Sequence, residues 1–573
     1  MNNIFRVIMN TNSDLKEKFY LPLFLCLLYV LINVLYFHPF DHNMKQTIFL
    51  PGSDAESFIW FIYWWPYAIK HGLNPFITHY IWSPGGVNLT WATAIPTLSL
   101  ITAPLTIMFG PVFSWNILSL LAAPLNASCA FVLLKYLYRN NAGAFIGGYV
   151  FGYSSYVIGQ LLGGHLNLDF VCLLPLSILL FIMLMNKDIN RYYFVIIVSI
   201  IIFLEAGIST EVLATATLFG FISIISFFVF DKNSRSKLLE SSLYLLLSYV
   251  IASVFLSPFL YFLIKGFDGA PRFVASPSTY SSDLLNYLIP TPVTRIGRSV
   301  FASIASRFTG NYSEEGAYIG LPLLFLTAFL FRDYIATHKK TGLALLTIFT
   351  IIIIFSFGPY LHVNGINTHI RMPWSFFSQA PLIGKALPTR FTNYVWLIIA
   401  IAIASWLSAA AATTKRYVVA IASILFIIPN TSIYNWGAPS VPSVFTKDDI
   451  LKHNNIMVLP FGYTGPSMYW QLKSGLKFNM VGGYVGLAPL PFRKMQVTSD
   501  LLYGKPGNRF HDLFKAYCRQ FNVMYVVACS GTPPPLVQSL NNEGWVADKY
   551  GQCTVYHVPQ NMIYTKNIHT KKD

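Results

Sequence analysis

The sequence predicts an α-helical polytopic membrane protein of about eleven spans, followed by a small α/β domain at its C-terminal end. Of its 573 residues, 54% are hydrophobic and only 11% are charged, less than half of the roughly 25% found in soluble proteins. Several windows of about 18 residues carry no charge, and a helix of that length crosses a bilayer. These features exclude a soluble multidomain enzyme, a disordered chain and a coiled coil.

The predicted spans are apolar runs bounded by polar or glycine-rich turns. They cover residues 20–37, 113–134, 143–161, 168–186, 192–204, 211–230, 238–264, 317–331, 342–357, 391–412 and 417–429. A further apolar stretch, 94–110, contains Pro96 and Pro104. Because an additional crossing there would invert every later loop, we expect a broken re-entrant or interfacial segment.

The distribution of Lys and Arg fixes the predicted orientation. With the N-terminus in the cytoplasm, six short inner segments hold 15 of the 39 Lys and Arg in 52 residues, whereas the outer segments before the tail hold 10 in 172. This contrast follows the positive-inside rule and accounts for the net charge of +16 without a nucleic-acid partner. The predicted domains are therefore a transmembrane domain, 1–429, with outer loops at 38–112, 265–316 and 358–390, and an extracytoplasmic domain, 430–573.

The segment 430–573 is predicted to fold as an α/β domain. Strands are expected in NNIMVLPFG and NVMYVVAC, helices in PSMYWQLKSG, HDLFKAYCRQF and LVQSLNNEG, and a hairpin in WVADKYGQCTVYHV. Cys518, Cys529 and Cys553 lie here, and one disulfide among them is possible. The loop VGGYVG lacks the strand and helix that flank a dinucleotide-binding motif, so no such site is expected.

Acidic residues of the first six spans gather at their outer ends. Asp169 begins the fourth span, Glu205 and Glu211 flank the turn EAGISTE, and His165 and Asn167 lie in the turn GGHLNL. Ionisable groups at membrane depth are costly and usually functional. The sequence therefore predicts a catalytic or ion site at the outer face. The alternative is that these side chains have only a structural role and form hydrogen bonds with the backbone or at the membrane interface.

The first outer loop contains PGSDAESFIWFIYWW. Ser53 and Glu56 form the S-x-x-E pattern of a capping box, and the aromatic run after them favours a helix at the membrane interface. The start of this helix would present Asp54, either as a catalytic base or as a cap residue.

Arg390 lies in ALPTRF, directly before a late span. Its planar guanidinium suits two oxygens of a phosphate group. A snorkelling arginine that anchors the helix to lipid headgroups is the alternative. The outer loop 265–316 offers four other candidates for a phosphate site, Arg272, Arg295, Arg298 and Arg307.

Several short motifs, in order along nearly the whole chain, resemble bacterial membrane proteins of the GT-C glycosyltransferase superfamily, in particular the YfhO-like group. They are SDAESFIWFIYWW, GLNPF, IWSPGGVNL, PLTIMFGP, FGYSS, GGHLNL, ALPTRF, and MYWQLKSG with VGGYVG. The resemblance implies a sugar donor carried on a polyprenyl phosphate, an acidic residue in the first outer loop, and inversion at the anomeric carbon. Asp54 matches that acid, but the paired-acid and WWD motifs of some relatives are absent.

The resemblance implies an integral-membrane glycosyltransferase of the bacterial inner membrane. It would move a sugar from a polyprenyl-phosphate donor to a glycan, lipid or protein acceptor of the cell envelope. Asp54 would be the catalytic base. The substrate site would draw on Glu56, His165, Asn167, Glu205, Glu211 and Arg390, with a divalent cation, Mg²⁺ or Mn²⁺, as a possible cofactor. A lipid-linked glycan transporter or flippase and a non-catalytic assembly factor are the alternative functions.

Overall fold

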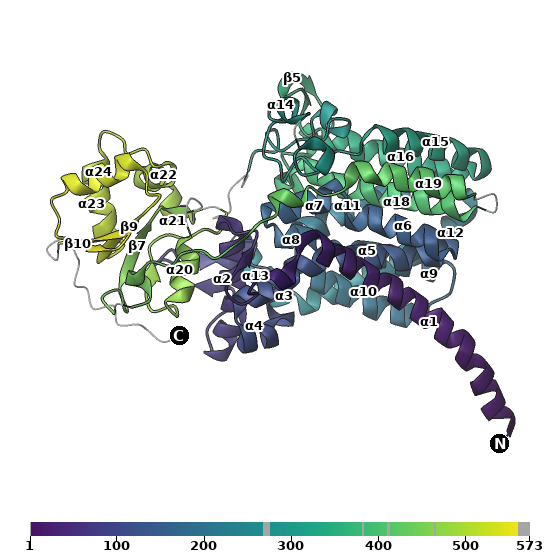
Figure 1. The fold of residues 1–573 in the computed structure, drawn as a ribbon, viewed down its shortest axis with the longest axis horizontal. Coiled ribbons are helices and arrows are strands. Elements are labelled where there is room, and N and C mark those ends of the chain that lie inside the picture. The colour runs from purple at the N-terminus through teal and green to yellow at the C-terminus, as the bar shows by residue number, and fades with distance from the viewer. Residues whose placement is uncertain are drawn as a thin grey trace. The chain divides into compact units, whose positions relative to one another are not determined.

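The computed structural model describes residues 2–266, 275–298, 300–380, 383–409, 413–447, 449–462, 466–486 and 488–559. Within these ranges, residues 2–19 and 53 are described by their backbone alone. It is predominantly helical (Figure 1) and divides into two compact units. The first unit comprises 1–43, 116–256 and 275–435, and the second comprises 44–115, 257–274 and 436–573. Most of the first predicted outer loop thus packs with the C-terminal segment, whereas the second predicted outer loop from residue 275 onward belongs to the first unit.

The first unit is a helical bundle. Its helices are α1 (Asn2–Phe37), α5 (Pro111–Tyr138, whose first turn belongs to the second unit), α6 (Asn141–Gly152), α7 (Ser155–Gly163), α8 (Leu166–Asp169), α9 (Leu173–Met185), α10 (Arg191–Ala206), α11 (Thr210–Phe230), α12 (Arg235–Phe255), α14 (Ala302–Ala305), α15 (Leu321–Thr337), α16 (Lys339–Ser356), α17 (Trp374–Phe377), α18 (Thr392–Ser408) and α19 (Thr414–Ile424). Among the described residues, seven segments are long and apolar enough to cross a membrane: 20–37, 111–138, 166–185, 210–230, 232–255, 339–356 and 388–408. The predicted fold class, a polytopic helical membrane protein, is confirmed.

Two predicted spans are interrupted. The span at 143–161 is two helices, α6 and α7, because Ser154 leaves the helical conformation and its side chain accepts a hydrogen bond from the Val157 amide. The span at 238–264 ends early at Phe255, and α13 (Ser257–Lys265) follows as part of the second unit. Pro258 explains this break, since proline cannot donate an amide hydrogen bond and disfavours helix in the residue before it.

The three shortest predicted spans form helices of 16, 17 and 11 residues, fewer than the ~20 of a typical crossing. The run at 192–204 extends by flanking residues to the 16 residues of α10, and that at 317–331 becomes the 17 residues of α15. The run at 417–429 yields the 11 residues of α19.

The core of the first unit is built around α18, which packs on α6, α16 and α15. Small residues permit this packing. A Cβ atom on Gly147 of α6 would lie 2.9 Å from the carbonyl oxygen of Ala400 on α18 and 2.6 Å from a methyl group of Leu134. The two helices therefore approach closely only because residue 147 has no side chain.

The second unit combines helices with a mixed sheet. Its helices are α2 (Ser53–Lys70), α3 (Pro96–Ile101), α4 (Ala103–Phe109), α13, α20 (Ser467–Lys473), α21 (Leu490–Arg493), α22 (Gln496–Tyr503), α23 (Phe510–Gln520) and α24 (Pro534–Asn542). The helices α3 and α4 divide 94–110 into two short pieces, as the broken-helix prediction requires. Whether this segment enters a membrane stays a prediction.

The C-terminal sheet has the strand order β10–β11–β9–β7–β8. Its strands are β7 (Asn455–Leu459), β8 (Asn479–Met480), β9 (Tyr525–Cys529), β10 (Ala547–Tyr550) and β11 (Cys553–His557). The predicted strands and hairpin are confirmed, and β9 pairs parallel with β7 and antiparallel with β11. Cys529 and Cys553 lie opposite each other in that antiparallel pair and form a disulfide, while Cys518 is a buried free thiol.

Candidate functional site

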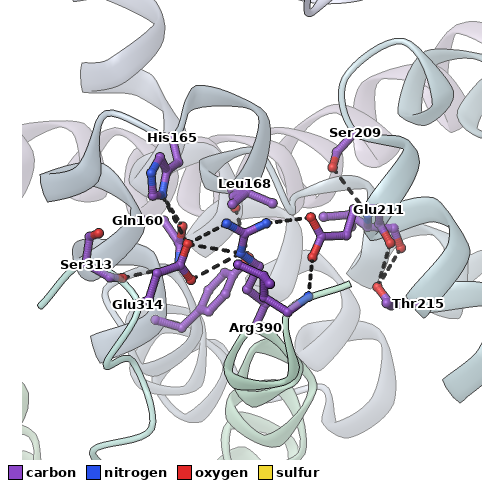
Figure 2. A network of polar contacts seen from close by, with 12 residues as sticks. Gln160, His165, Leu168, Ser209, Glu211, Thr215, Ser313, Glu314 and Arg390 are labelled. Atoms are coloured by element: carbon purple, nitrogen blue, oxygen red, sulfur yellow. Dashed lines mark hydrogen bonds and ion pairs between the residues drawn. The ribbon is translucent and has the colours of Figure 1, made fainter. Parts of the chain in front are cut away.

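Arg390 lies at the centre of a buried ion-pair cluster in the first unit (Figure 2). Its Nε atom donates to both carboxylate oxygens of Glu314 at 3.1 Å, and one terminal nitrogen donates to Glu314 as well. Its other terminal nitrogen donates to Glu211. One guanidinium thus joins two carboxylates that lie 103 residues apart in the sequence.

A second layer holds Glu314 from the other side. Gln160 donates through its side-chain amide to a Glu314 carboxylate oxygen at 3.1 Å and to the Ser313 carbonyl at 3.2 Å. The Nδ1 atom of His165 lies 2.7 Å from the Gln160 amide oxygen and 3.6 Å from Glu314. All five side chains point toward one another in Figure 2.

Local turns aim these side chains. Gly164, in the left-handed conformation, ends α7 and reverses the chain toward His165. Ser209 caps α11 by accepting from the Val212 amide, which places Glu211 in the first turn of that helix. The Glu211 carboxylate also accepts from the backbone amide of Leu387 at 3.0 Å.

The electrostatics of the cluster are those of a closed ion pair. Burial by itself would raise the pKa of Glu314, but the positive charge and hydrogen bonds of Arg390 reverse the effect and hold that pKa below its usual value. Only 3% of the Glu314 side chain and 17% of the Arg390 side chain are exposed. Both groups are therefore ionised, and each provides much of the stabilisation that the other lost on leaving water.

Two other predicted site residues in the first unit do not join the cluster. Glu205 is buried near the C-terminal end of α10, and its Oε1 atom has no hydrogen-bond partner among the described residues. Asn167 is buried in α8 and makes none of the cluster's hydrogen bonds. Of the alternative phosphate candidates, Arg272 lies outside the described residues, and Arg295, Arg298 and Arg307 take no part in the cluster.

Asp54 and Glu56 belong to the second unit. Helix α2 begins at Ser53, as expected, but Gly52 occupies the N-cap position, so the predicted capping box with Ser53 as cap is wrong. The chain enters the helix from an extended conformation at Gly52, and the Ser53 side chain lies outside the described residues. Asp54 is consequently a half-buried first-turn residue, where the helix dipole stabilises a carboxylate.

Glu56 has a different environment from Asp54. It is 7% exposed, and burial raises its pKa to about 7. Its face of α2 lies toward α20 of the C-terminal segment, where Gln471 accepts a hydrogen bond of 3.0 Å from the Trp60 indole. On a helix, residues at positions i and i+2 point in directions that differ by about 200°, so Asp54 and Glu56 do not form a pair of acids on one face.

The sequence reading missed Glu314 and Gln160. Glu314 lies in SEEG, two adjacent acids shortly before a span, and that was a usable signal because acids there are costly. It also missed the hairpin of β4 (Tyr360–Val363) and β5 (Ile366–Arg371), although its turn, Asn364–Gly365, is the strongest short hairpin signal.

A divalent cation has no ready ligand set in the cluster. No group of three His, Cys, Asp or Glu side chains suited to a metal ion occurs in the part of the chain that the structure describes. Arg390 already supplies the positive charge between the two carboxylates. Binding of Mg²⁺ or Mn²⁺ there would require displacement of the guanidinium.

Comparison with solved structures identifies the architecture. The chain is similar to arabinofuranosyltransferase AftD from Mycobacteria (TM-score 0.57, 12% identity, 94% of this chain and 40% of AftD). It is also similar to ArnT from Cupriavidus metallidurans, bound to undecaprenyl phosphate (TM-score 0.51, 11% identity, 96% of this chain and 100% of ArnT). A third similar structure is the archaeal oligosaccharyltransferase AglB from Archaeoglobus fulgidus, in complex with a peptide and a dolichol-phosphate (TM-score 0.50, 12% identity, 96% of this chain and 75% of AglB).

The fold is GT-C-like. The chain spans about 40% of the length of AftD, and identities near 12% establish the fold alone. No family model and no curated protein matches the sequence. Membership of the YfhO-like group stays a prediction.

Proposed function

We propose that this protein is a membrane glycosyltransferase that moves a sugar from a polyprenyl-phosphate donor to a cell-envelope acceptor. The observation that carries the proposal is the fold, which covers at least 94% of this chain in all three comparisons. Two of those proteins are named as sugar transferases, and two were solved with a long-chain lipid phosphate. That chemistry is what the resemblance of the sequence motifs implies.

Asp54 is the proposed base. The reaction needs a group that accepts the proton of the acceptor hydroxyl as the new glycosidic bond forms. Asp54 lies in the first turn of α2, at the positive end of the helix dipole. Glu56 is buried, and the rise of its pKa to about 7 makes it a second proton-exchanging group on the other face of the helix.

Arg390 is better assigned to the framework of the site than to the donor phosphate. The cluster of Arg390, Glu211 and Glu314 carries two negative charges against one positive charge, and a net negative group repels phosphate. Arginine has five N–H donors, and those already engaged face the two carboxylates. Among the described residues, the phosphate-binding role passes to Arg295, Arg298 or Arg307 of the predicted outer loop 265–316.

The test is a transfer assay with polyprenyl-phosphate sugars and the purified full chain. Asp54→Asn should lower the rate by about a hundredfold or more, the usual contribution of a positioned base. Asp41→Asn, an exposed acid of the first predicted outer loop, is the matched control and should retain the activity. A well-folded Asp54→Asn variant with full activity would remove Asp54 from the chemistry, and movement of a lipid-linked glycan without a new glycosidic bond would favour a flippase.

The proposed location is the bacterial inner membrane, with the N-terminus in the cytoplasm and the C-terminal domain outside. The Cys529–Cys553 disulfide supports this side for the tail, since disulfides persist in oxidising compartments. A topology reporter fused after Asp573 should be active outside the cytoplasm, and one fused after Lys237 should be active inside. The reverse result at either position would contradict the orientation.

A further inference from the structure

A cavity of 490 Å³ opens between helices of the first unit, among α5, α15, α16 and α18. Helices α15, α16 and α18 lie side by side (Figure 1). Cavities of about 300–1,000 Å³ are the usual size for small-molecule sites. None of the residues around Arg390 lines this cavity, so it is a separate feature.

The cavity changes in character along its length. Leu330, Phe331, Ile398 and Ile401 form an apolar part, and each lies several residues inside its helix. Asp333, Thr337, His338, Ser405 and Ser408 form a polar part near the helix ends. From Ile398 to Ser408, α18 rises about 15 Å, roughly half of a 30 Å hydrocarbon core. An apolar slot of this depth with a polar mouth has the length and polarity to hold a lipid of one membrane leaflet.

The mouth offers charges of both signs. Asp333 is exposed, and no described residue forms an ion pair with its carboxylate. Beside it, the His338 ring stacks on Tyr334 at 4.8 Å between centroids. On α18, Trp406 lines the cavity, and the Arg416 guanidinium lies 5.3 Å from its ring centre and donates to its carbonyl oxygen at 3.0 Å. An acid and aromatic rings thus line a single opening, and the Arg416 guanidinium lies against one of those rings without lining the cavity.

The helix ends that form the mouth are predicted to face the cytoplasm. Near these ends, Lys135 lies in the last turn of α5, Arg139 follows that helix, Lys339 begins α16 and Lys415 lies in the first turn of α19. They belong to the inner segments of the positive-inside count and do not line the cavity itself. Basic pockets between transmembrane helices on this side suit lipid phosphates. The exposed carboxylate of Asp333 is in addition free to pair with a cationic group at the mouth, which a phosphate alone does not supply.

We propose that this cavity binds an inner-leaflet phospholipid whose headgroup joins a phosphate to a primary amine, as in phosphatidylethanolamine. The acyl chain lies along the apolar walls, and the ammonium group pairs with Asp333 and the faces of Tyr334 and Trp406. The phosphate lies toward Arg416 and the neighbouring lysines. The inference is independent of the proposed transferase activity, because it concerns a site at the opposite ends of the helices.

The experiment uses the full chain in phosphatidylcholine nanodiscs with a phosphatidylethanolamine that carries a photoreactive diazirine in its acyl chain. Mass spectrometry should locate the cross-links on peptides that contain 330–338 and 398–406. Unlabelled phosphatidylethanolamine should displace the probe, and phosphatidylglycerol, which has the phosphate without the amine, should do so only at about tenfold higher concentration, as expected for loss of one charge-assisted bond.

Two variants test the recognition. Asp333→Asn should bring the two competing lipids to the same potency, whereas Glu240→Gln, the same change at an exposed acid of α12 outside the cavity, should leave the tenfold preference intact. Ala402→Phe should fill the cavity and abolish the cross-links. Equal competition by both lipids in the unmodified chain, cross-links spread over all helices, or stronger displacement by undecaprenyl phosphate would each overturn the proposal.

Discussion

Glu314 and Glu315 are adjacent in the sequence and both are buried, at 4% and 7% exposure, yet their environments are opposite. Glu314 faces the guanidinium of Arg390, which holds its pKa below the usual value despite burial. Glu315 is buried without such a partner. Burial, and then the nearby charge of Asp283, raises the pKa of Glu315 to about 8.

The region around Glu315 is organised by a different acid. The Asp283 carboxylate accepts from the backbone amides of Leu285, Asn364 and Gly365 at 2.7–3.0 Å and so fixes the β4–β5 turn. One oxygen of Glu315 and the Nδ1 atom of His362 are buried without a hydrogen-bond partner among the described residues. Burial by itself therefore does not decide the state of an acid, because a neighbouring cation can reverse its effect on the pKa.

The largest test of this contrast is removal of Arg390. Arg390→Ala leaves the buried carboxylate of Glu314 and the half-buried carboxylate of Glu211 without their cation, and we expect a loss of about 3–5 kcal/mol in the free energy of unfolding. Arg390→Lys should lose less, because lysine keeps the charge but lacks the fork that holds two carboxylates. Unfolding of the detergent-solubilised protein by SDS titration measures both.

Arg332→Ala removes an exposed arginine of α15 and serves as the control for that experiment. Its effect should stay within about 0.5 kcal/mol. If Arg390→Ala changed the free energy of unfolding as little as Arg332→Ala, the cluster would not be a buried ion pair. The contrast between the environments of Glu314 and Glu315 would then disappear.

The second test uses pH. The folded-state pKa of Glu315, about 8, lies above its ordinary value of 4.5, so the folded protein retains a proton that the unfolded chain loses. Stability from this group is complete below about pH 4.5 and falls as the pH rises toward 8, by at most about 1.4 kcal/mol per pH unit. Glu315→Gln should remove that decline, which parallel unfolding titrations from pH 5 to 8 would detect.

Glu314→Gln is the matched comparison. Because the pKa of Glu314 is lowered, its contribution is present at neutral pH and is lost only as the pH falls through the folded-state pKa. Glu314→Gln should therefore lower the free energy of unfolding across pH 5 to 8. The decline of stability with rising pH should remain in this variant. Identical pH profiles for the two variants would contradict the distinction between these neighbours.

The smallest expected effect is at His165. His165→Ala removes the hydrogen bond to Gln160 while leaving the contacts of Gln160 and Arg390 with Glu314, so a loss of about 0.5–1.5 kcal/mol is expected. The same SDS titration measures it. A loss as large as that of Arg390→Ala would mean that His165 carries part of the charge balance of Glu314.

Much of the fold could be predicted from sequence because the signals are local. Long uncharged runs specify helices of membrane length whatever their neighbours, and short continuous apolar runs indicated the strands around 455–459 and 525–529. The interruption at Leu256 and the turn at Asn364–Gly365 were not predicted, although Pro258 and the Asn–Gly pair are local signals for them. These features depend on backbone chemistry within a few residues.

The sequence by itself thus determined the class of protein, most of its helices and the presence of Arg390 and Glu211 at the ends of spans. Only the tertiary structure decided that Arg390 is paired, because its partner Glu314 lies 76 residues away and two adjacent glutamates are indistinguishable in sequence. Folding turned one toward a guanidinium and left the other beside Asp283. Charge interactions depend on distance in space and on exclusion of water, and neither quantity exists until the helices have packed.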